Sequence, residues 1–163
     1  MHRRFIPRTR ITWGVMLLIL LALSLGSCQN SVPEAKALDP AALSAALLED
    51  LSFPTMLEIA PERLQRYYPY DSSVFSVAYV HLAFDVVADE IAVFQVDESQ
   101  KVADIKAGLN KHYSERADVF SAYAPEESAR INNRLTVEHD RWLIIVITDD
   151  TETAEDIVNA HIH

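Results

Sequence analysis

Residues 74–96 read VFSVAYVHLAFDVVADEIAVFQV, and this stretch decides the predicted fold. Two segments within it, 74–84 and 90–96, are dense in Val, Phe, Tyr and Ile, the residue types that are enriched in β-strands. The connection between them, residues 85–89, is short enough for a hairpin. We therefore expect two adjacent antiparallel strands.

A long amphipathic helix is expected immediately after this hairpin. Asp97 or Ser99 can cap its N-terminus, and the helix should reach about Phe120. Its apolar side chains recur at helical spacing, which predicts that the helix packs on the core rather than forming a binding groove. The stripe consists of Val102, Ile105, Leu109, Tyr113, Ala117 and Phe120.

Further elements are expected on both sides of this region. Asp39 and Pro40 place a capping residue before a proline at the first helical position, so a helix should begin there and reach Leu51. A short helix is expected at 61–68 and a helical turn or two at 125–132. A second hairpin should have strands 135–137 and 142–148 around a His139-Asp140 turn. A final helix is expected at 151–160, capped by Asp149, Asp150 or Thr151. Strand pairs that alternate with helices without regular βαβ spacing predict an α+β domain with packed helices and a small, largely antiparallel sheet of about four strands.

The first 27 residues have the composition of an export signal. Four arginines and no acidic residue precede residues 11–25, which are almost wholly apolar and rich in leucine. This apolar run is shorter than the roughly 20 residues that a helix needs to cross a bilayer. A cleaved signal peptide is therefore favoured over an uncleaved anchor.

Directly after this run, Leu25-Gly26-Ser27-Cys28 resembles the lipobox of bacterial lipoproteins. The resemblance implies that Cys28 receives diacylglycerol and becomes the first residue after cleavage. Cys28 is also the only cysteine in the chain, so lipidation explains a thiol that can form no internal disulfide. Two acyl chains give a stable membrane anchor, and no other cofactor is expected.

The predicted organisation is a signal peptide at 1–27, a lipidated cysteine and tether at 28–38, and a single domain at 39–163. The tether reaches at most roughly 30 Å from the membrane. After cleavage, ten basic and 24 acidic residues remain, a net charge of −14. Such a surface is a poor partner for nucleic acid, because phosphate binding depends on concentrated positive charge. The acidity is typical of a soluble domain, and a preference for a basic partner is the alternative.

Several classes of chemistry are disfavoured by residue content. Glycine occurs only at positions 14, 26 and 108, so the glycine-rich loops of dinucleotide-binding proteins, P-loop proteins and serine hydrolases are absent. His161 and His163, with His139, Asp149 and Asp150 as possible neighbours, match no recognised zinc spacing, and we expect no metal site.

Two other groups of side chains are candidate sites. His81 and Asp85 would form an acid–base pair if they met, but a core histidine is the favoured interpretation. Tyr67, Tyr68 and Tyr70 are the candidate binding residues, since exposed tyrosines anchor peptides or stack on sugars. The alternative is that the three tyrosines pack on the sheet. No residue is assigned as catalytic.

The pattern as a whole looks like the lipoprotein family defined by domain of unknown function 4358. The resemblance covers about residues 40 to 160, and this chain departs from it at His139-Asp140, where members commonly have glycine. It implies a setting, since the family is found largely in Gram-positive bacteria, and it carries over no catalytic residues. The residues that carry it are Glu90-Ile91-Ala92-Val93-Phe94, the helix ending in Phe120, Tyr123, Pro125 and the 142–148 strand with its acidic cap.

These observations favour a noncatalytic lipoprotein on the extracytoplasmic face of the cell membrane. Its partners would be the membrane, through the lipid anchor, and another envelope component, most simply a protein. A domain that binds a small ligand or a cell-wall polymer is the first alternative, and a hydrolase built from scattered acids and histidines is the second. A concave pocket lined by the tyrosines would favour the first alternative, whereas converging histidine and carboxylate groups would favour the second.

Overall fold

The computed structural model of the chain describes residues 37–84 and 86–163. The predicted signal peptide, Cys28 and most of the predicted tether lie outside these residues. No helix in the described part has the length and apolar character needed to cross a membrane.

One antiparallel sheet of five strands forms the centre of the described part, in the order β1-β2-β3-β5-β4. Both expected hairpins are present, and the predicted α+β fold is confirmed. The unpredicted strand is β1, whose three half-exposed or exposed residues give too short a pattern to recognise. The strands are β1 (Met56–Glu58), β2 (Phe75–Ala83), β3 (Glu90–Val96), β4 (Leu135–His139) and β5 (Trp142–Ile147).

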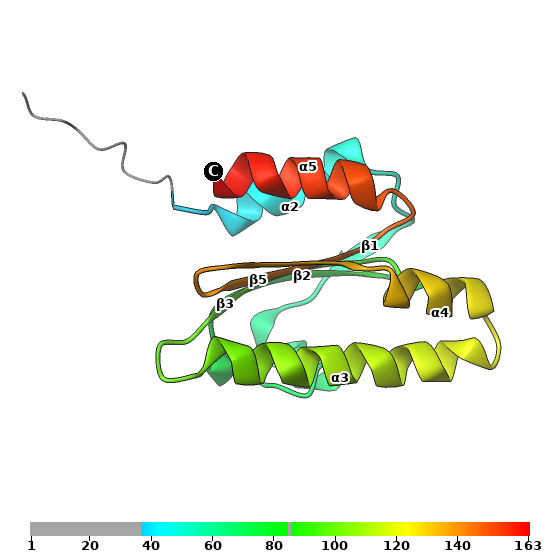
Figure 1. The fold of residues 1–163 in the computed structure, drawn as a ribbon, viewed down its shortest axis with the longest axis horizontal. Helices are drawn as coiled ribbons and strands as arrows, with labels where there is room; N and C mark the ends of the chain where they lie inside the picture. The colour runs from blue at the N-terminus through cyan, green and yellow to red at the C-terminus, as the bar shows by residue number, and fades with distance from the viewer. Residues whose placement is uncertain (1–36, 85) are drawn as a thin grey trace, which may run out of the picture. The chain divides into compact units, whose positions relative to one another are not determined.

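Helices cover both faces of the sheet (Figure 1). On one face lie α2 (Pro40–Asp50) and α5 (Thr151–Ile162), and on the other lie α3 (Val102–Ser121) and α4 (Pro125–Asn132). Two 3-10 helices, η2 (Pro61–Arg66) and η3 (Ser72–Val74), connect β1 to β2. Because β3 and β5 lie in the middle of this three-layer arrangement, their side chains are buried on both faces, which explains their continuous apolar runs.

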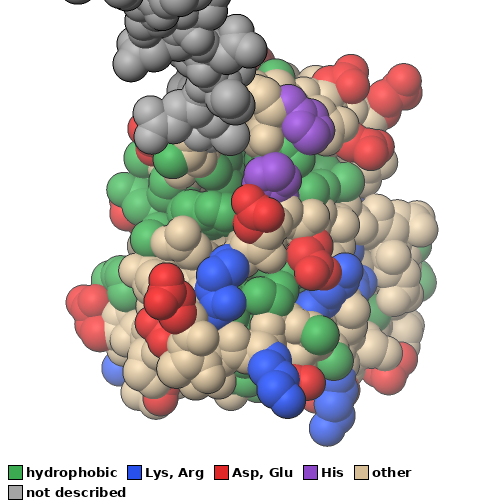
Figure 2. All heavy atoms as spheres, turned by 60° about the vertical axis from the view of Figure 1, so that its left-hand side comes forward, with side chains coloured by type: hydrophobic (Ala, Val, Ile, Leu, Met, Phe, Trp, Pro, Cys, Tyr) green, Lys and Arg blue, Asp and Glu red, His purple; other side chains and the backbone are tan. Residues whose placement is uncertain are grey.

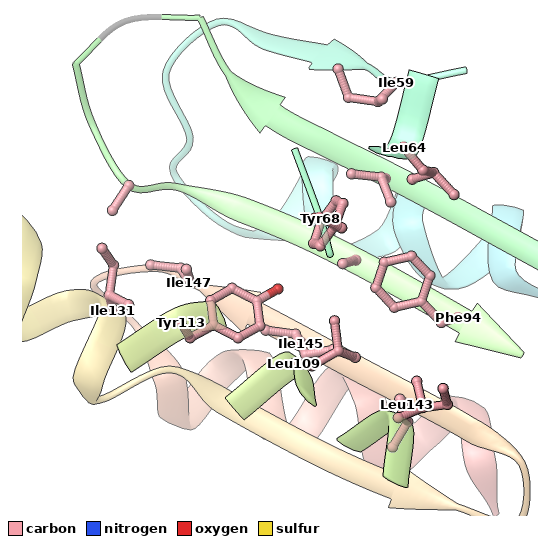
Figure 3. Close-up of a cluster of buried hydrophobic side chains, with 14 of the residues drawn as sticks. Ile59, Leu64, Tyr68, Phe94, Leu109, Tyr113, Ile131, Leu143, Ile145 and Ile147 are labelled. Atoms are coloured by element: carbon pink, nitrogen blue, oxygen red, sulfur yellow. The ribbon is translucent and has the colours of Figure 1, made fainter. Parts of the chain in front are cut away.

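Each face of the sheet has its own hydrophobic core. The core under α2 and α5 includes Leu38, the last residue of the predicted tether. The core under α3 contains Tyr68, Phe94 and Tyr113 (Figure 3). The predicted stripe of α3 is confirmed as core, because Ile105, Leu109, Tyr113, Ala117 and Phe120 are all buried.

The helix caps agree with the sequence at some positions and differ at others. Asp39 accepts hydrogen bonds from the backbone N–H groups of Ala41 and Ala42, as predicted, and Asp150 caps α5. The capping prediction for α3 was wrong, because its N-cap residue is Lys101 and makes no side-chain capping bond. Asp97 Oδ1 instead accepts from the Ser99 N–H at 2.9 Å, within the turn that precedes the helix.

The predicted helix at 61–68 and the second hairpin turn also differ in detail. The former is the 3-10 helix η2, which ends at Arg66. The turn between β4 and β5 consists of Asp140 and Arg141, with His139 paired to Trp142. Asp140 has a positive φ of 51°, a conformation that Asp tolerates better than most residues. A glycine is therefore not required at this turn.

Candidate ligand-binding cavity

A cavity of about 410 Å³ opens on the α3 side of the sheet, beside β1 and the C-terminal end of β2. Its volume lies within the range of pockets that hold small ligands or partner side chains. Most of its walls are apolar, and three polar residues reach it from the sheet and from α3. The lining residues are Leu57, Ile59, Tyr67, Tyr68, Leu82, Ala83, Phe84, Val87, Glu90, His112, Arg116 and Phe120.

Glu90, the first residue of β3, is the centre of the polar part of the lining. The hydroxyl of Tyr68 donates to Glu90 Oε1 at 2.6 Å, and the hydroxyl of Tyr113 donates to the same oxygen. Arg116 forms an ion pair with Glu90 Oε2 and donates a second hydrogen bond to the carbonyl of Ala88 at 3.2 Å. Figure 3 shows Tyr68 and Tyr113 in the same buried cluster, although they come from different elements. A carboxylate that is only 1% exposed is thus compensated by three donors.

A second set of ion pairs holds α4 against the connection between β2 and β3. Arg130 binds both oxygens of Asp89, and its Nη1 lies 3.0 Å from Glu127 Oε2. Glu127 Oε2 also accepts a hydrogen bond from the Ala88 N–H at 2.7 Å. Arg130 Nε lies 2.8 Å from Asp149 Oδ1, an ion-pair contact without hydrogen-bond geometry. The wall of the cavity at residues 87–90 is therefore fixed from both helices.

The polar part of the cavity carries little net charge. Burial lowers the pKa of His112 below its ordinary value, so this imidazole is neutral near pH 7. Burial alone would lower the pKa of Arg116, but Glu90 and the adjacent tyrosines outweigh it and raise that pKa. Burial, followed by the charge of Glu90, raises the pKa of Tyr68 and Tyr113 well above ordinary values. One negative and one positive charge remain, and they pair with each other.

Four of the six exposed large hydrophobic side chains of the described residues lie at this cavity. Leu57, Tyr67 and Phe84 line it while remaining between 42% and 68% exposed. The fourth is Tyr123, whose ring packs against that of the lining residue Phe120 with 5.2 Å between the centroids. Leu57, Tyr67, Phe84 and Tyr123 are called the apolar rim below.

The three candidate tyrosines have different environments. Tyr67 and Tyr68 line the cavity, with Tyr67 exposed and Tyr68 buried against Glu90. Tyr70 does not line it, and its ring packs edge-on against Phe75 at 6.1 Å between centroids. The tyrosine cluster thus divides between the cavity and the core.

The histidines and acids considered for a metal do not converge in the described part of the chain, where no group of three or more possible ligands is found. His161 Nδ1 contacts the carbonyl of Ile157 at 2.8 Å, Asp149 pairs with Arg130, and Asp150 caps α5. The rings of His139 and His163 lie 6.2 Å apart beside a second, larger cleft. Figure 2 views the end of the molecule that carries the β4–β5 turn, where histidine, acidic and basic side chains alternate with hydrophobic ones.

His81 is half-buried on β2, opposite Glu58 of β1. Its Nδ1 is buried and has no hydrogen-bond partner among the described residues. Burial lowers its pKa. Asp85, its proposed partner, lies outside the described residues.

Sequence reasoning missed the polar residues of the cavity: Glu90, His112 and Arg116. The available signal was weak but present. Glu90 is an acid at the start of a strand that is otherwise apolar and buried, and Arg116 follows the apolar stripe position Tyr113 by three residues. Residues three apart on a helix lie on similar sides, so Arg116 could have been expected at the edge of the core.

Fold and cavity together define the class of the protein. It is an α+β domain in which an open, antiparallel five-stranded sheet lies between two helical layers, with a mostly apolar cavity near one edge of the sheet. The chain belongs to the family described as domain of unknown function (DUF4358), whose model matches residues 49–148. No curated protein and no solved structure matches it.

Proposed function

We propose that the chain is a noncatalytic, lipid-anchored domain that binds another protein of the bacterial envelope through the cavity and its apolar rim. The lipobox at residues 25–28 supports the location. The single observation that supports the activity is a mostly apolar cavity bordered by the exposed hydrophobic side chains of the apolar rim. Contiguous exposed apolar surface of this kind marks interaction sites on soluble domains.

A small ligand or a wall polymer is the second candidate. The cavity favours it because Tyr67 and Tyr68 form part of the wall, and because the volume suits a small molecule. A small molecule in the cavity would nevertheless leave the rim residue Tyr123 uncovered, since it lies outside the lining. A protein partner accounts for the whole rim.

A hydrolase is supported less well by this geometry. His112 and Glu90 line the same cavity, but Glu90 already accepts hydrogen bonds from two tyrosines and an arginine. Both oxygens of this carboxylate are therefore already engaged by donors of the protein itself. A binding role for these residues therefore fits better than general base catalysis.

Site-specific photocrosslinking in intact cells tests the proposed binding. A photoreactive residue at Phe84 should crosslink reproducibly to one envelope protein, and Leu57→Ser should reduce the yield severalfold. The matched control is the same photoreactive residue at Glu155, which is exposed on α5 and lies on the opposite face of the sheet. Equal crosslinking from both positions would contradict a specific site at the cavity.

The lipid anchor requires a separate test. Cys28→Ala should release the protein from membranes or leave an unprocessed precursor, because the acyl chains would no longer be attached. Membrane fractionation and the mass of the mature N-terminus measure this. Fractionation and processing like the wild-type protein would rule out the lipoprotein interpretation.

A further inference from the structure

The outer edge of β1 lies beside the cavity and has unpaired backbone groups. Ile59 N–H donates to the Val80 carbonyl at 2.8 Å, and Phe84 N–H donates to the Thr55 carbonyl at 3.0 Å. In an antiparallel pair, alternate residues bond to the neighbouring strand. The N–H and C=O groups of Met56 and Glu58 therefore point away from β2. No hydrogen bond from another described residue reaches them.

This edge and the cavity share one face of the sheet. Leu57 and Ile59 of the β1 segment both line the cavity, as does Leu82, which pairs with Leu57 across the strands. Side chains alternate between the two faces along a strand. A strand added beside β1 would consequently direct every second side chain toward the same face as Leu57 and the cavity.

The charges restrict which side chain the cavity can hold. Glu90 and Arg116 neutralise each other, and His112 is neutral near pH 7, so a charged group in the cavity would have no uncompensated partner. The edge itself has the exposed carboxylate of Glu58, and the whole chain has a net charge of −10. Complementarity therefore calls for an uncharged group inside the cavity and for positive charge beside the edge.

From this geometry we infer that the cavity and the β1 edge together bind an extended peptide segment of the partner. The segment pairs with β1 as an added strand, inserts an uncharged aromatic or branched aliphatic side chain into the cavity, and has Lys or Arg next to that side chain. Main-chain hydrogen bonds supply affinity in this mode, and the pocket for an alternate side chain supplies specificity. The inference rests on the function proposed above for the same site.

The test uses the full chain, purified in detergent, and a phage-displayed library of random peptides. Selected peptides should share an apolar residue with flanking Lys or Arg, and synthetic copies should bind in solution. Glu58→Pro removes the N–H that points away from β2 without removing a bond of the sheet, because proline is tolerated on edge strands. It should weaken binding by about tenfold, the effect expected of one lost hydrogen bond of about 1 to 1.5 kcal/mol.

The matched control is Glu58→Ala, which removes the carboxylate but keeps the N–H. It should weaken binding clearly less than Glu58→Pro. Thermal unfolding close to that of the wild-type chain establishes that Glu58→Pro is folded. If Glu58→Pro is unfolded, the test uses Met56→Pro instead, which removes the other N–H of β1 that points away from β2.

Each other outcome overturns a defined part of the inference. Peptides that bind Glu58→Pro normally but fail to bind Phe84→Ser would rule out strand pairing and leave the cavity as the binding site. Failure of the library to yield any peptide would overturn the peptide occupant, while crosslinking from Phe84 would still support the proposed function. A concentration-dependent dimer that Glu58→Pro abolishes would assign the edge to a second copy of the chain and overturn the partner segment.

Discussion

The hydroxyl oxygen of Tyr70 occupies the space that a side chain at Gly108 would need, since a Cβ built on Gly108 would lie 1.8 Å from it. Gly108 is in the interior of α3, where glycine costs about 1 kcal/mol relative to alanine. The glycine lowers the intrinsic stability of the helix, and the Tyr70 side chain occupies the space that its missing side chain leaves. This contact places Tyr70 over α3, near the residues that form the cavity wall.

A double-mutant cycle measures this relationship. In the wild-type background, Gly108→Ala should fail to stabilise the protein, because the new methyl group displaces the Tyr70 ring. In a Tyr70→Ala background, the same substitution should stabilise it by about 1 kcal/mol through helix propensity alone. Urea unfolding of the four proteins gives the coupling. Equal effects in both backgrounds would show that the close approach has no energetic consequence.

Removal of the Glu90 carboxylate should strongly destabilise the domain. Glu90→Gln leaves the partly buried Arg116 without its ion partner, and loss of one partner of a buried pair costs about 3 to 5 kcal/mol. The control is Glu115→Gln, which changes an exposed acid on α3, next to Arg116; the Glu115 carboxylate lies 3.6 Å from the Lys111 ammonium. We expect the control to change the free energy of unfolding very little. Similar losses for both variants would contradict a structural role for the Glu90–Arg116 pair.

The protein should lose stability in alkali. Burial raises the pKa of Tyr68 and Tyr113 in the folded state, so above about pH 10 the unfolded chain releases protons that the folded chain retains. The free energy of unfolding should therefore fall as the pH rises from about 9 to about 12. Tyr68→Phe removes one of the two groups and should reduce the slope. An unchanged slope would show that Tyr68 does not contribute to alkaline unfolding.

Acid should also destabilise the domain, through a different group. Burial lowers the pKa of His112 in the folded state, so just below the ordinary value of about 6.5 the unfolded chain binds the extra proton first. Stability should decrease as the pH falls through this region and level off once the folded histidine is protonated. His112→Asn removes the group, and urea midpoints at several pH values should then show a weaker dependence between about pH 7 and 5. The same dependence in both proteins would contradict this assignment.

The fold could be predicted largely because its main signals are local. The apolar runs at 74–84 and 90–96, the stripe of α3 and the Asp39 cap each depend on residues close together in sequence. Strand β1 could not be predicted in this way. It has only three residues, one of them Leu57 with its side chain exposed, and it exists because the Ile59 and Phe84 N–H groups bond across the sheet edge.

The candidate site was predicted only in part, through Tyr67 and Tyr68. No local pattern connects these tyrosines to Glu90, 22 residues after Tyr68, or to Arg116, a further 26 residues along. Tyr68, Glu90 and Arg116 come together because β3 is the central strand of the sheet, and because α3 and the segment after η2 pack on the same face of it. Whether a tyrosine faces a carboxylate, a cavity or a glycine depends on such long-range contacts.

The sequence by itself determined the class of fold, the helices and strands with clear hydrophobic periodicity, the acidic charge and the expected lipidation at Cys28. These properties could be predicted because composition and hydrophobic periodicity are features of short segments. Only the tertiary structure decided that Glu90 is buried with three donors, that the Tyr70 hydroxyl lies against Gly108, and that the apolar rim borders one cavity. These properties depend on distances between residues far apart in the chain, which are fixed only when the two helical layers pack on the sheet.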